Sequence, residues 1–343
     1  MNTTRYFYLD VLKSMAIFAV VLLHQSGTDV RNMTLDNFTW MANNFYFTIS
    51  HFGVPLFVMV SGALLLSSTK NYDILSWYKK AFLRIILPLF IWSVIYYIYR
   101  TPLEHLSLST FFIKFMSDKV SGHFWFLYMI FGIYLSLPFI RAALKDINDK
   151  TLNILLFIWF IIYIISPMTN YFFHLKVNIQ EYIISLYIGY FLLGYLLHKI
   201  EITYKVYLIS ILILIISMLT TVFGTYFLKT SSEKLINILW LNKSLPIFLI
   251  TNTIFIIVKY NFLHVDIINQ WWKKLIISIS ISSYGIYLIH IIIRNYSNSK
   301  LNITFLLDNP YLYIFGMSFV IITISYILIL LIKKIPYIGT YIW

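Results

Sequence analysis

Long apolar segments follow one another along the whole chain of 343 residues, and short polar stretches separate them. A helix that crosses the hydrocarbon core of a bilayer needs about 20 mostly apolar residues. Segments of this kind occupy 8–26, 45–66, 82–99, 124–140, 152–168, 182–198, 204–227, 238–259, 275–293 and 311–332. The pattern predicts an all-α polytopic membrane protein, a bundle of about ten transmembrane helices.

The second of these segments contains residues that interrupt a helix. Gly53 and Pro55 lie within 45–66, and proline removes a backbone donor from a helix interior. Membranes tolerate broken helices only where protein or water surrounds the freed backbone groups. We therefore expect the second span to be broken or re-entrant. The polar stretches near 27–44 and 100–123 are too short to fold alone, so we expect a single transmembrane domain over 1–343 with no appended soluble domain.

Composition agrees with a membrane protein and narrows the chemistry. The chain is 60% hydrophobic and 11% charged, whereas ordinary soluble domains carry about 25% charged residues. The net charge of +13 comes from cations scattered over short loops, without the basic run or domain that grips nucleic acid. We therefore expect a lipid bilayer and not nucleic acid as a partner. Cysteine is absent, which excludes disulfides, zinc–thiolate sites and a cysteine nucleophile.

The distribution of lysine and arginine predicts an orientation. Loops on the amino-terminal side hold 15 of the 26 cations and the opposite loops hold 10, with Lys13 left inside the first span. Cytoplasmic loops carry the excess of positive charge, so we expect both termini in the cytoplasm and a multi-pass location in the cell membrane. Gln25 and Ser26 follow the first span without a small-x-small cleavage pattern, so this span is expected to stay as an anchor.

The first span carries two ionisable residues on one face, in the phrase KSMAIFAVVLLH. Lys13 and His24 are eleven residues apart, which is close to three helical turns and about 16 Å. Lys13 falls near the cytoplasmic boundary, where an interface anchor paired with Asp10 is one interpretation. His24 falls in the outer half, where a neutral histidine bonded between helices is the plain alternative. An ionisable residue at that depth is a functional candidate.

Three further histidines are expected on the outer side with His24, namely His51, His123 and His290. None of the four is spaced from another as an i,i+4 pair of metal ligands, so no metal site is predicted. Transmembrane proton relays usually use carboxylates, which the spans nearly lack. Histidine can instead accept a proton from a hydroxyl near neutral pH. The other histidines are expected in outer loops or at the inner interface: His105, His174, His198 and His264.

Seven phrases of the sequence, in order, resemble a known family. They are YLDVLKSMAIFAVVLLH, FGVPLFVMVSGALLL, WYKKAFLRIILPLFIWS, GHFWFLYMIFGIYLSLPFI, YFLLGYLL, SSYGIYLIH and KKIPYIGTYI. Together they make the chain similar to the acyltransferase 3 family of integral membrane acyltransferases over essentially its whole length. The resemblance implies about ten transmembrane helices that move an acyl group, often acetyl, from cytoplasmic acyl-CoA to hydroxyls of cell-surface glycans or related acceptors.

The resemblance also implies roles for particular residues. The family's basic-x10-His motif falls on Lys13 and His24, so His24 is the expected catalytic residue and Lys13 supports it or the donor. The family's Ser-Gly turn falls on Ser61 and Gly62. We expect Ser61 to contribute to the substrate site together with three further residues: His123, Trp125 and His290.

One motif departs from the family pattern. The usual Arg-x-x-Arg needs a cation at position 81, and this chain has Ala81 before Arg84. Lys79 and Lys80 are expected to supply the missing charge, although lysine does not reproduce the bidentate phosphate pairing of arginine. These three cations would attract the CoA phosphates at the cytoplasmic mouth. The donor would extend along the first helix to His24, which acts either as the base or as an acyl carrier.

The sequence therefore favours a membrane O-acyltransferase of the cell envelope, an enzyme that transfers an acyl group other than an amino-acyl group, with acetyl as the expected group. The first alternative is a transporter or flippase for a glycan or lipid-linked precursor. The second is a sensor or scaffold without activity. The sequence leaves open the acceptor, the acyl group, the direct or His-acylated route, and the oligomeric state.

Overall fold

The computed structural model describes residues 5–30, 36–68, 73–167, 185–229, 238–263, 269–300 and 309–335, and every regular element within these ranges is a helix. Eight stretches of them are long and apolar enough to cross a membrane: Phe7–Gly27, Asn37–Leu66, Ile74–Arg100, Trp125–Asp146, Tyr204–Leu228, Ile238–Phe262, Gln270–Lys300 and Pro310–Ile332. The two other expected spans, 152–168 and 182–198, are helical where they are described and adjoin residues 168–184, which lie outside the description. The predicted all-α polytopic class is confirmed.

The helices form two compact units. The first unit, residues 1–67 and 152–327, contains α1 (Phe7–Val30), α2 (Asn37–Ser50), α3 (Gly53–Leu66), most of α8 (Asp149–Phe160), η3 (Ile161–Ile165), α10 (Leu186–Lys199), α11 (Tyr204–Leu228), α13 (Leu245–Phe262), α14 (Gln270–Lys300) and most of α16 (Pro310–Ile332). The second unit, residues 68–151 and 328–343, contains α4 (Ile74–Ala81), η1 (Phe82–Ile86), α5 (Leu87–Arg100), η2 (Leu103–His105), α6 (Leu108–Met116) and α7 (Trp125–Asp146).

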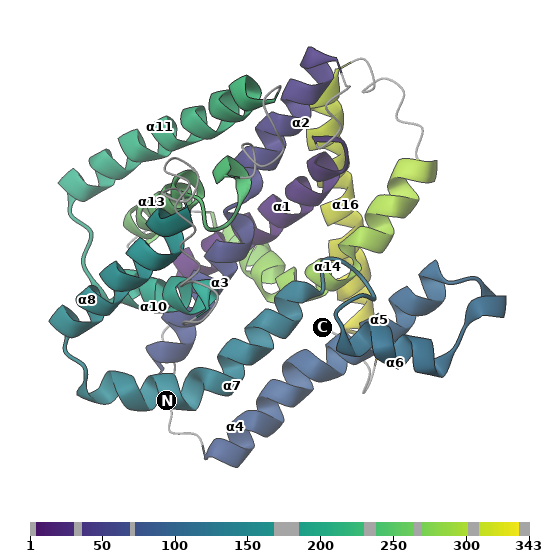
Figure 1. Cartoon of the computed structure of the whole chain (residues 1–343), viewed down its shortest axis with the longest axis horizontal. Helices are drawn as coiled ribbons and strands as arrows, with labels where there is room; N and C mark the ends of the chain where they lie inside the picture. The colour runs from purple at the N-terminus through teal and green to yellow at the C-terminus, as the bar shows by residue number, and fades with distance from the viewer. Residues whose placement is uncertain are drawn as a thin grey trace. The chain divides into compact units, whose positions relative to one another are not determined.

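Helix α1 is the central element of the first unit and packs against α2, α3, α13 and α14 (Figure 1). A buried carboxylate fixes its beginning. Arg5 donates two hydrogen bonds of 2.7 Å to Asp10, and Ser280 of α14 donates a third of 2.7 Å. The hydrogen bonds that Arg5 donates to Asp10 raise the pKa of Arg5. A buried carboxylate needs such partners, so the amino-terminal end of α1 is anchored to α14.

Helices α3 and α10 cross so closely that only glycine fits at the contact. A Cβ added to Gly62 would lie 1.8 Å from the backbone oxygen of Phe191, and one added to Gly194 would lie 2.0 Å from that of Met59. Small residues allow this approach between membrane helices, where packing replaces the hydrophobic effect as the driving force. The glycine of the Ser-Gly pair in the second span is therefore the crossing point of two helices.

The second span is broken, as its Gly53 and Pro55 predict. Helix α2 ends at Ser50, the turn His51–Phe52 follows, and α3 begins at Gly53. Pro55 occupies the first turn of α3, where a helix leaves its backbone N–H groups without intrahelical partners and proline is tolerated. A Cβ on Gly53 would lie 3.0 Å from the backbone oxygen of Ala16, so the break also lets α3 begin directly against α1.

The third span begins earlier than its apolar run. Residues Ile74–Arg100 form one continuous helical stretch, in which α4 and α5 are joined by the wide π-turn η1. Leu87 donates to the carbonyl of Phe82 at the end of this turn, directly before Pro88. The π-turn η3 likewise ends directly before Ser166 and Pro167. Since proline has no N–H and its ring displaces the carbonyl one turn earlier, widening the turn relieves the clash.

Candidate active site

His24 lies on α1, six residues before the end of the helix, with its side chain half-buried. Because α1 is helical without interruption from Phe7 to Val30, Lys13 and His24 share a face about 16 Å apart along the axis. The two residues of the basic-x10-His motif are therefore aligned but not in contact. The immediate surroundings of His24 come from α14.

His290 of α14 is the ring beside His24. The two ring centroids are 5.1 Å apart and the planes are inclined by 39°. His290 is fully buried, and its Nδ1 lies 2.6 Å from the carbonyl oxygen of Tyr287. A carbonyl oxygen can only accept, so Nδ1 carries the proton and Nε2 of the neutral ring carries the lone pair. The structure thus pairs one fixed, neutral imidazole with the candidate catalytic one.

Arg294 follows His290 by one helical turn and binds the backbone of His24. Its Nη1 donates to the His24 carbonyl oxygen over 2.8 Å. The apolar run 275–293 ends directly before Arg294, which places Arg294 among the 10 cations of the opposite loops, but α14 continues to Lys300. The sequence signal for placing Arg294 at the site is its i,i+4 spacing from His290, since residues four apart share a helix face.

His51 completes the surroundings of His24 in the first unit. His290, Arg294 and His51 all lie close enough to His24 to interact with it electrostatically. His51 lies in the turn between α2 and α3, where its Nδ1 donates to the Phe47 carbonyl over 2.7 Å. Three of the four histidines expected on the outer side therefore surround one point. Among the residues that the structure describes, no group of three histidine or acidic side chains is placed to hold a metal ion.

Lys13 lies toward the other end of α1, near the anchored carboxylate. Lys13 is a half-buried residue, and the charges of Asp10 and Arg5 act on its ammonium. Asp10 itself is bound by Arg5 and Ser280. Lys13, interpreted as an interface anchor paired with Asp10, interacts electrostatically with Asp10, while Arg5 and Ser280 donate hydrogen bonds to this carboxylate.

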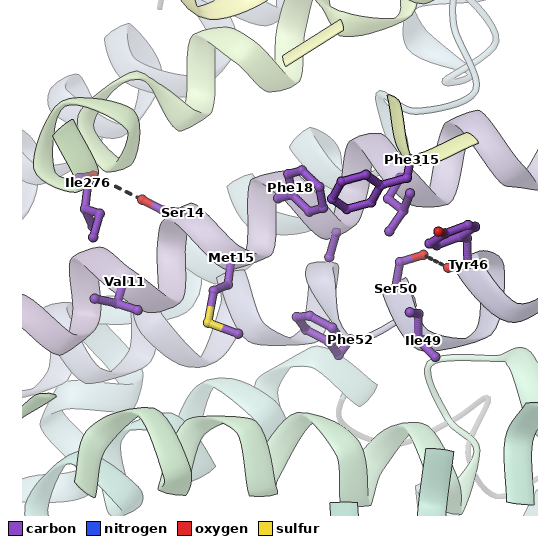
Figure 2. A pocket seen from close by; sticks show the side chains of 12 residues that line it. Val11, Ser14, Met15, Phe18, Tyr46, Ile49, Ser50, Phe52, Ile276 and Phe315 are labelled. Atoms are coloured by element: carbon purple, nitrogen blue, oxygen red, sulfur yellow. Dashed lines mark hydrogen bonds between the residues drawn. The ribbon is translucent and has the colours of Figure 1, made fainter. Parts of the chain in front are cut away.

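A cavity of about 440 Å³ lies against α1, and Figure 2 shows the side chains that line it. It is lined by Val11, Ser14, Met15, Phe18, Ala19, Leu22, Tyr46, Ile49, Ser50, Phe52, Ile276 and Phe315. At about 100° per residue, Lys13 and His24 point roughly 200° away from Val11 and Leu22. The cavity is almost entirely apolar, and neither Lys13 nor His24 is among the residues that line it.

The three cations expected to bind CoA phosphates lie in the second unit. Lys79, Lys80 and Arg84 are all exposed, on α4 and η1, so an anion can reach them. Arg84 also acts electrostatically on Tyr134 of α7. Ala81 is only 1% exposed, so the position at which the family carries its first arginine faces the packed side of this helix.

The remaining predicted site residues are distributed over both units. Ser61 of α3 donates to the Phe57 carbonyl of its own helix over 2.9 Å. His123 belongs to the second unit, where its Nδ1 lies 2.9 Å from the Ser121 hydroxyl and its ring contacts Tyr96 and Phe124. Trp125 opens α7 and is half-buried. Of the predicted substrate residues, His290 is the one whose ring contacts His24.

The structure describes two of the four histidines that were expected outside the site, His105 and His198. His105 is exposed beside Glu104 at 3.9 Å, in agreement with the expected solvation. His198 forms a hydrogen bond with the Tyr8 hydroxyl. His174 and His264 lie outside the described residues.

Comparison with known proteins gives one match. The sequence model of a family described as an acyltransferase domain matches residues 6–330. No curated protein and no solved structure matches the chain. The matched range begins just before α1 and ends inside α16, so it covers most of both units and every candidate residue described above.

Proposed function

The chain belongs to the acyltransferase family matched over residues 6–330 and is a membrane acyltransferase, and from this premise we propose that it moves an acyl group, acetyl in the simplest case, from cytoplasmic acyl-CoA to a hydroxyl of a cell-envelope glycan. The observation that carries the proposal is the group formed by His24, His290 and Arg294 at the contact of α1 and α14. It combines a half-buried imidazole, a fixed neutral imidazole and a cation.

His24 is proposed as the catalytic residue because it is the reactive group that a substrate can approach. Its side chain is half-buried, whereas His290 is fully buried and already donates to Tyr287. A neutral imidazole accepts a proton from a hydroxyl that reaches hydrogen-bond distance. His290 then acts as a positioning residue that packs against the His24 ring.

The proposed step conserves atoms and charge. The His24 ring takes the proton of the acceptor hydroxyl while the hydroxyl oxygen attacks the thioester carbonyl. The C–O bond of the new ester forms, the C–S bond breaks, and the CoA sulfur leaves with the proton that His24 gives back. In the second route, a His24 nitrogen attacks the thioester first, and the acceptor hydroxyl then attacks the acyl-imidazole.

The donor is proposed to bind through its phosphates. Lys79, Lys80 and Arg84 are exposed cations, and cations of this kind attract phosphate through charge-assisted hydrogen bonds. Lys13 shares the α1 face with His24, which supports a role between the donor and the catalytic ring. With both termini in the cytoplasm, Lys13 lies on the donor side and His24 toward the acceptor side.

Mass spectrometry of envelope polymers tests this function in cells. Cells that make the chain are compared with cells that lack it, and we expect one ester to be missing from the polymers of the latter. The wild-type chain restores this ester on re-expression, whereas His24→Ala is inserted in equal amount but does not.

The two competing functions predict different results. A flippase with the substitution His24→Ala still delivers its glycan and the ester pattern is unchanged. An inactive scaffold gives the same ester content with and without the chain, and purified protein never releases free CoA from acetyl-CoA. Either result contradicts the proposed acyltransferase function.

A further inference from the structure

The apolar cavity of about 440 Å³ belongs to the first unit, and the transfer step described above does not use it (Figure 2). Helix α1 lines it with one stripe, formed by Val11, Met15, Phe18 and Leu22, at the spacing of residues that share a helix face. The stripe covers about 16 Å of helix, roughly half of a hydrocarbon core of about 30 Å. A cavity that follows one stripe of a helix is elongated, which suits a single extended chain.

The serine hydroxyls on the wall of the cavity are bonded to the protein itself. The Ser14 hydroxyl donates to the Ile276 carbonyl over 3.1 Å, and the Ser50 hydroxyl donates to carbonyls of its own helix. A hydroxyl has one hydrogen to donate, so neither serine offers a donor to a ligand. Tyr46 packs its ring against that of Phe315, with 6.4 Å between the ring centroids. The lining therefore favours a hydrocarbon over a sugar, whose hydroxyls would be buried there without hydrogen bonds.

The lining of the cavity reaches from the buried core to a side chain exposed at membrane depth. Ala19 and Leu22 line the cavity and are buried. Phe315 also lines it but is 47% exposed, and it lies within Pro310–Ile332, a stretch apolar enough to cross a membrane. An exposed phenyl ring within a membrane span contacts lipid, so a hydrocarbon chain can enter the cavity from the bilayer.

One end of the cavity lies near the candidate catalytic histidine. Ser50 and Phe52 both line the cavity, and they flank His51 in the chain. His51 in turn interacts electrostatically with His24. Figure 2 shows Ser50 at the end of the cavity away from Val11. A chain that lies in the cavity therefore has one of its ends near the reacting groups.

We propose that this cavity binds the hydrocarbon chain of a lipid-linked acceptor, so that the enzyme acylates a glycan that is still attached to a single-chain lipid such as a polyprenyl phosphate. The chain lies along the α1 stripe, and its head emerges at the His51 end, where a sugar hydroxyl can reach His24. Burial of the chain contributes binding energy, and its direction along α1 orients the head toward the catalytic ring. This inference rests on the proposed function, which makes the ligand at His24 a glycan hydroxyl.

Thermal unfolding of the purified full-length chain in detergent, without donor, tests the lipid site separately from catalysis. A ligand that binds only the folded chain raises its Tm. A saturating polyprenyl phosphate is expected to raise the Tm of the wild type by at least about 2 °C. Isopentenyl phosphate has the same head and almost no chain, so it should leave the Tm unchanged. Phosphatidylglycerol, an anionic lipid with two chains, should raise the Tm less than the polyprenyl phosphate does.

A substitution that fills the cavity assigns the shift in Tm to it. Ile49 of α2 lines the cavity and is half-buried. The larger ring in Ile49→Trp should occupy the space of the chain and abolish the shift produced by polyprenyl phosphate. Ile209→Trp is the matched control, because Ile209 is 46% exposed on α11 and is not among the lining residues. This control should keep the wild-type shift.

Acyl transfer shows whether the bound chain belongs to the acceptor. Ile49→Trp is expected to raise the KM for a polyprenyl-linked glycan at least about tenfold, because only a linked acceptor loses buried apolar contacts. The KM for the same glycan without its lipid should equal that of the wild type.

The comparison of the three probes on the wild type does not depend on how the variants fold. No shift with polyprenyl phosphate, or an equal shift with isopentenyl phosphate or with phosphatidylglycerol, overturns the inference. So does a full shift in Ile49→Trp, or an unchanged KM of this variant for the polyprenyl-linked glycan. If the shift is specific and disappears in Ile49→Trp but the wild type transfers no acyl group, the proposed function fails while the lipid site stands.

Discussion

At the scale of single residues, the site is organised by hydrogen bonds to backbone carbonyls. His290 donates to Tyr287, His51 donates to Phe47, and Arg294 donates to His24 itself. A carbonyl acceptor fixes which ring nitrogen of each histidine carries the proton. The consequence is a set of rings with defined tautomers around His24, the residue proposed as the general base.

His290 is predicted to act through the position of His24. In His290→Leu the ring 5.1 Å from that of His24 is removed, and we expect kcat to fall by about a hundredfold, the loss that a misplaced catalytic group of this kind produces. The KM for the acyl donor should stay unchanged, because the cations proposed to bind its phosphates are untouched. Steady-state kinetics of the purified variant measure both constants.

Two further variants distinguish positioning from a general structural role. His290→Asn keeps a donor for the Tyr287 carbonyl and should recover part of the lost kcat. His105→Leu removes an exposed histidine and should change neither constant. A His290→Leu enzyme with wild-type kcat, or one whose donor KM rises in proportion to the loss, would contradict a positioning role.

At the scale of helices, the crossing of α3 and α10 is predicted to be the most sensitive to added volume. Gly62→Ala and Gly194→Ala place a methyl group 1.8 and 2.0 Å from backbone oxygens, so the helices must separate. Overpacking of this kind destabilises by about 1–3 kcal/mol. Thermal unfolding in detergent should show a lower Tm for both variants.

Gly132→Ala is the matched control for these glycines. Nothing lies within 4 Å of a Cβ added at Gly132 in α7, and alanine is favoured over glycine in a helix by about 0.5–1 kcal/mol. Its Tm should therefore rise or stay the same. The crossing is refuted as a close contact if all three variants unfold at the wild-type temperature.

Much of the helical architecture follows from the sequence. The apolar runs predict the spans, the eleven-residue spacing predicts that Lys13 and His24 share a face, and Gly53 with Pro55 predicts a broken second span. Helix ends are harder to predict from the sequence, because a helix continues past its apolar run where its polar residues find hydrogen-bond partners. Arg294 illustrates this limit, since it follows the apolar run 275–293 and yet lies on α14, bonded to the His24 carbonyl.

The sequence does not show which side chains of different helices contact each other. The depth of His290 predicts an outer position, but only packing shows that its ring meets that of His24. Similarly, the Ser-Gly pair of the second span reads as one motif, yet Ser61 bonds to its own helix and Gly62 contacts α10. Sequence spacing along one helix carries no information about which neighbour a side chain faces.

At the scale of the whole molecule, the predicted orientation can be tested directly because the chain contains no cysteine. Single substitutions Glu104→Cys and Lys334→Cys introduce thiols at exposed positions, in η2 and after α16. A membrane-impermeant maleimide should label position 104 in intact cells and position 334 only after permeabilisation. The unsubstituted chain is the blank, and labelling of position 334 in intact cells would place the carboxyl terminus outside.

Acyl transfer by the purified protein is the measurement that tests the central claim most directly. Wild type and His24→Ala, matched for folding by Tm, receive acetyl-CoA labelled in the acetyl group together with an envelope glycan, and label in the glycan and free CoA are counted. The wild type should form labelled ester and CoA in equal amounts, and His24→Ala should be slower by about 10²–10⁴-fold, as expected for loss of a general base. If His24→Ala transfers label at the wild-type rate, the chemistry does not depend on the imidazole at position 24.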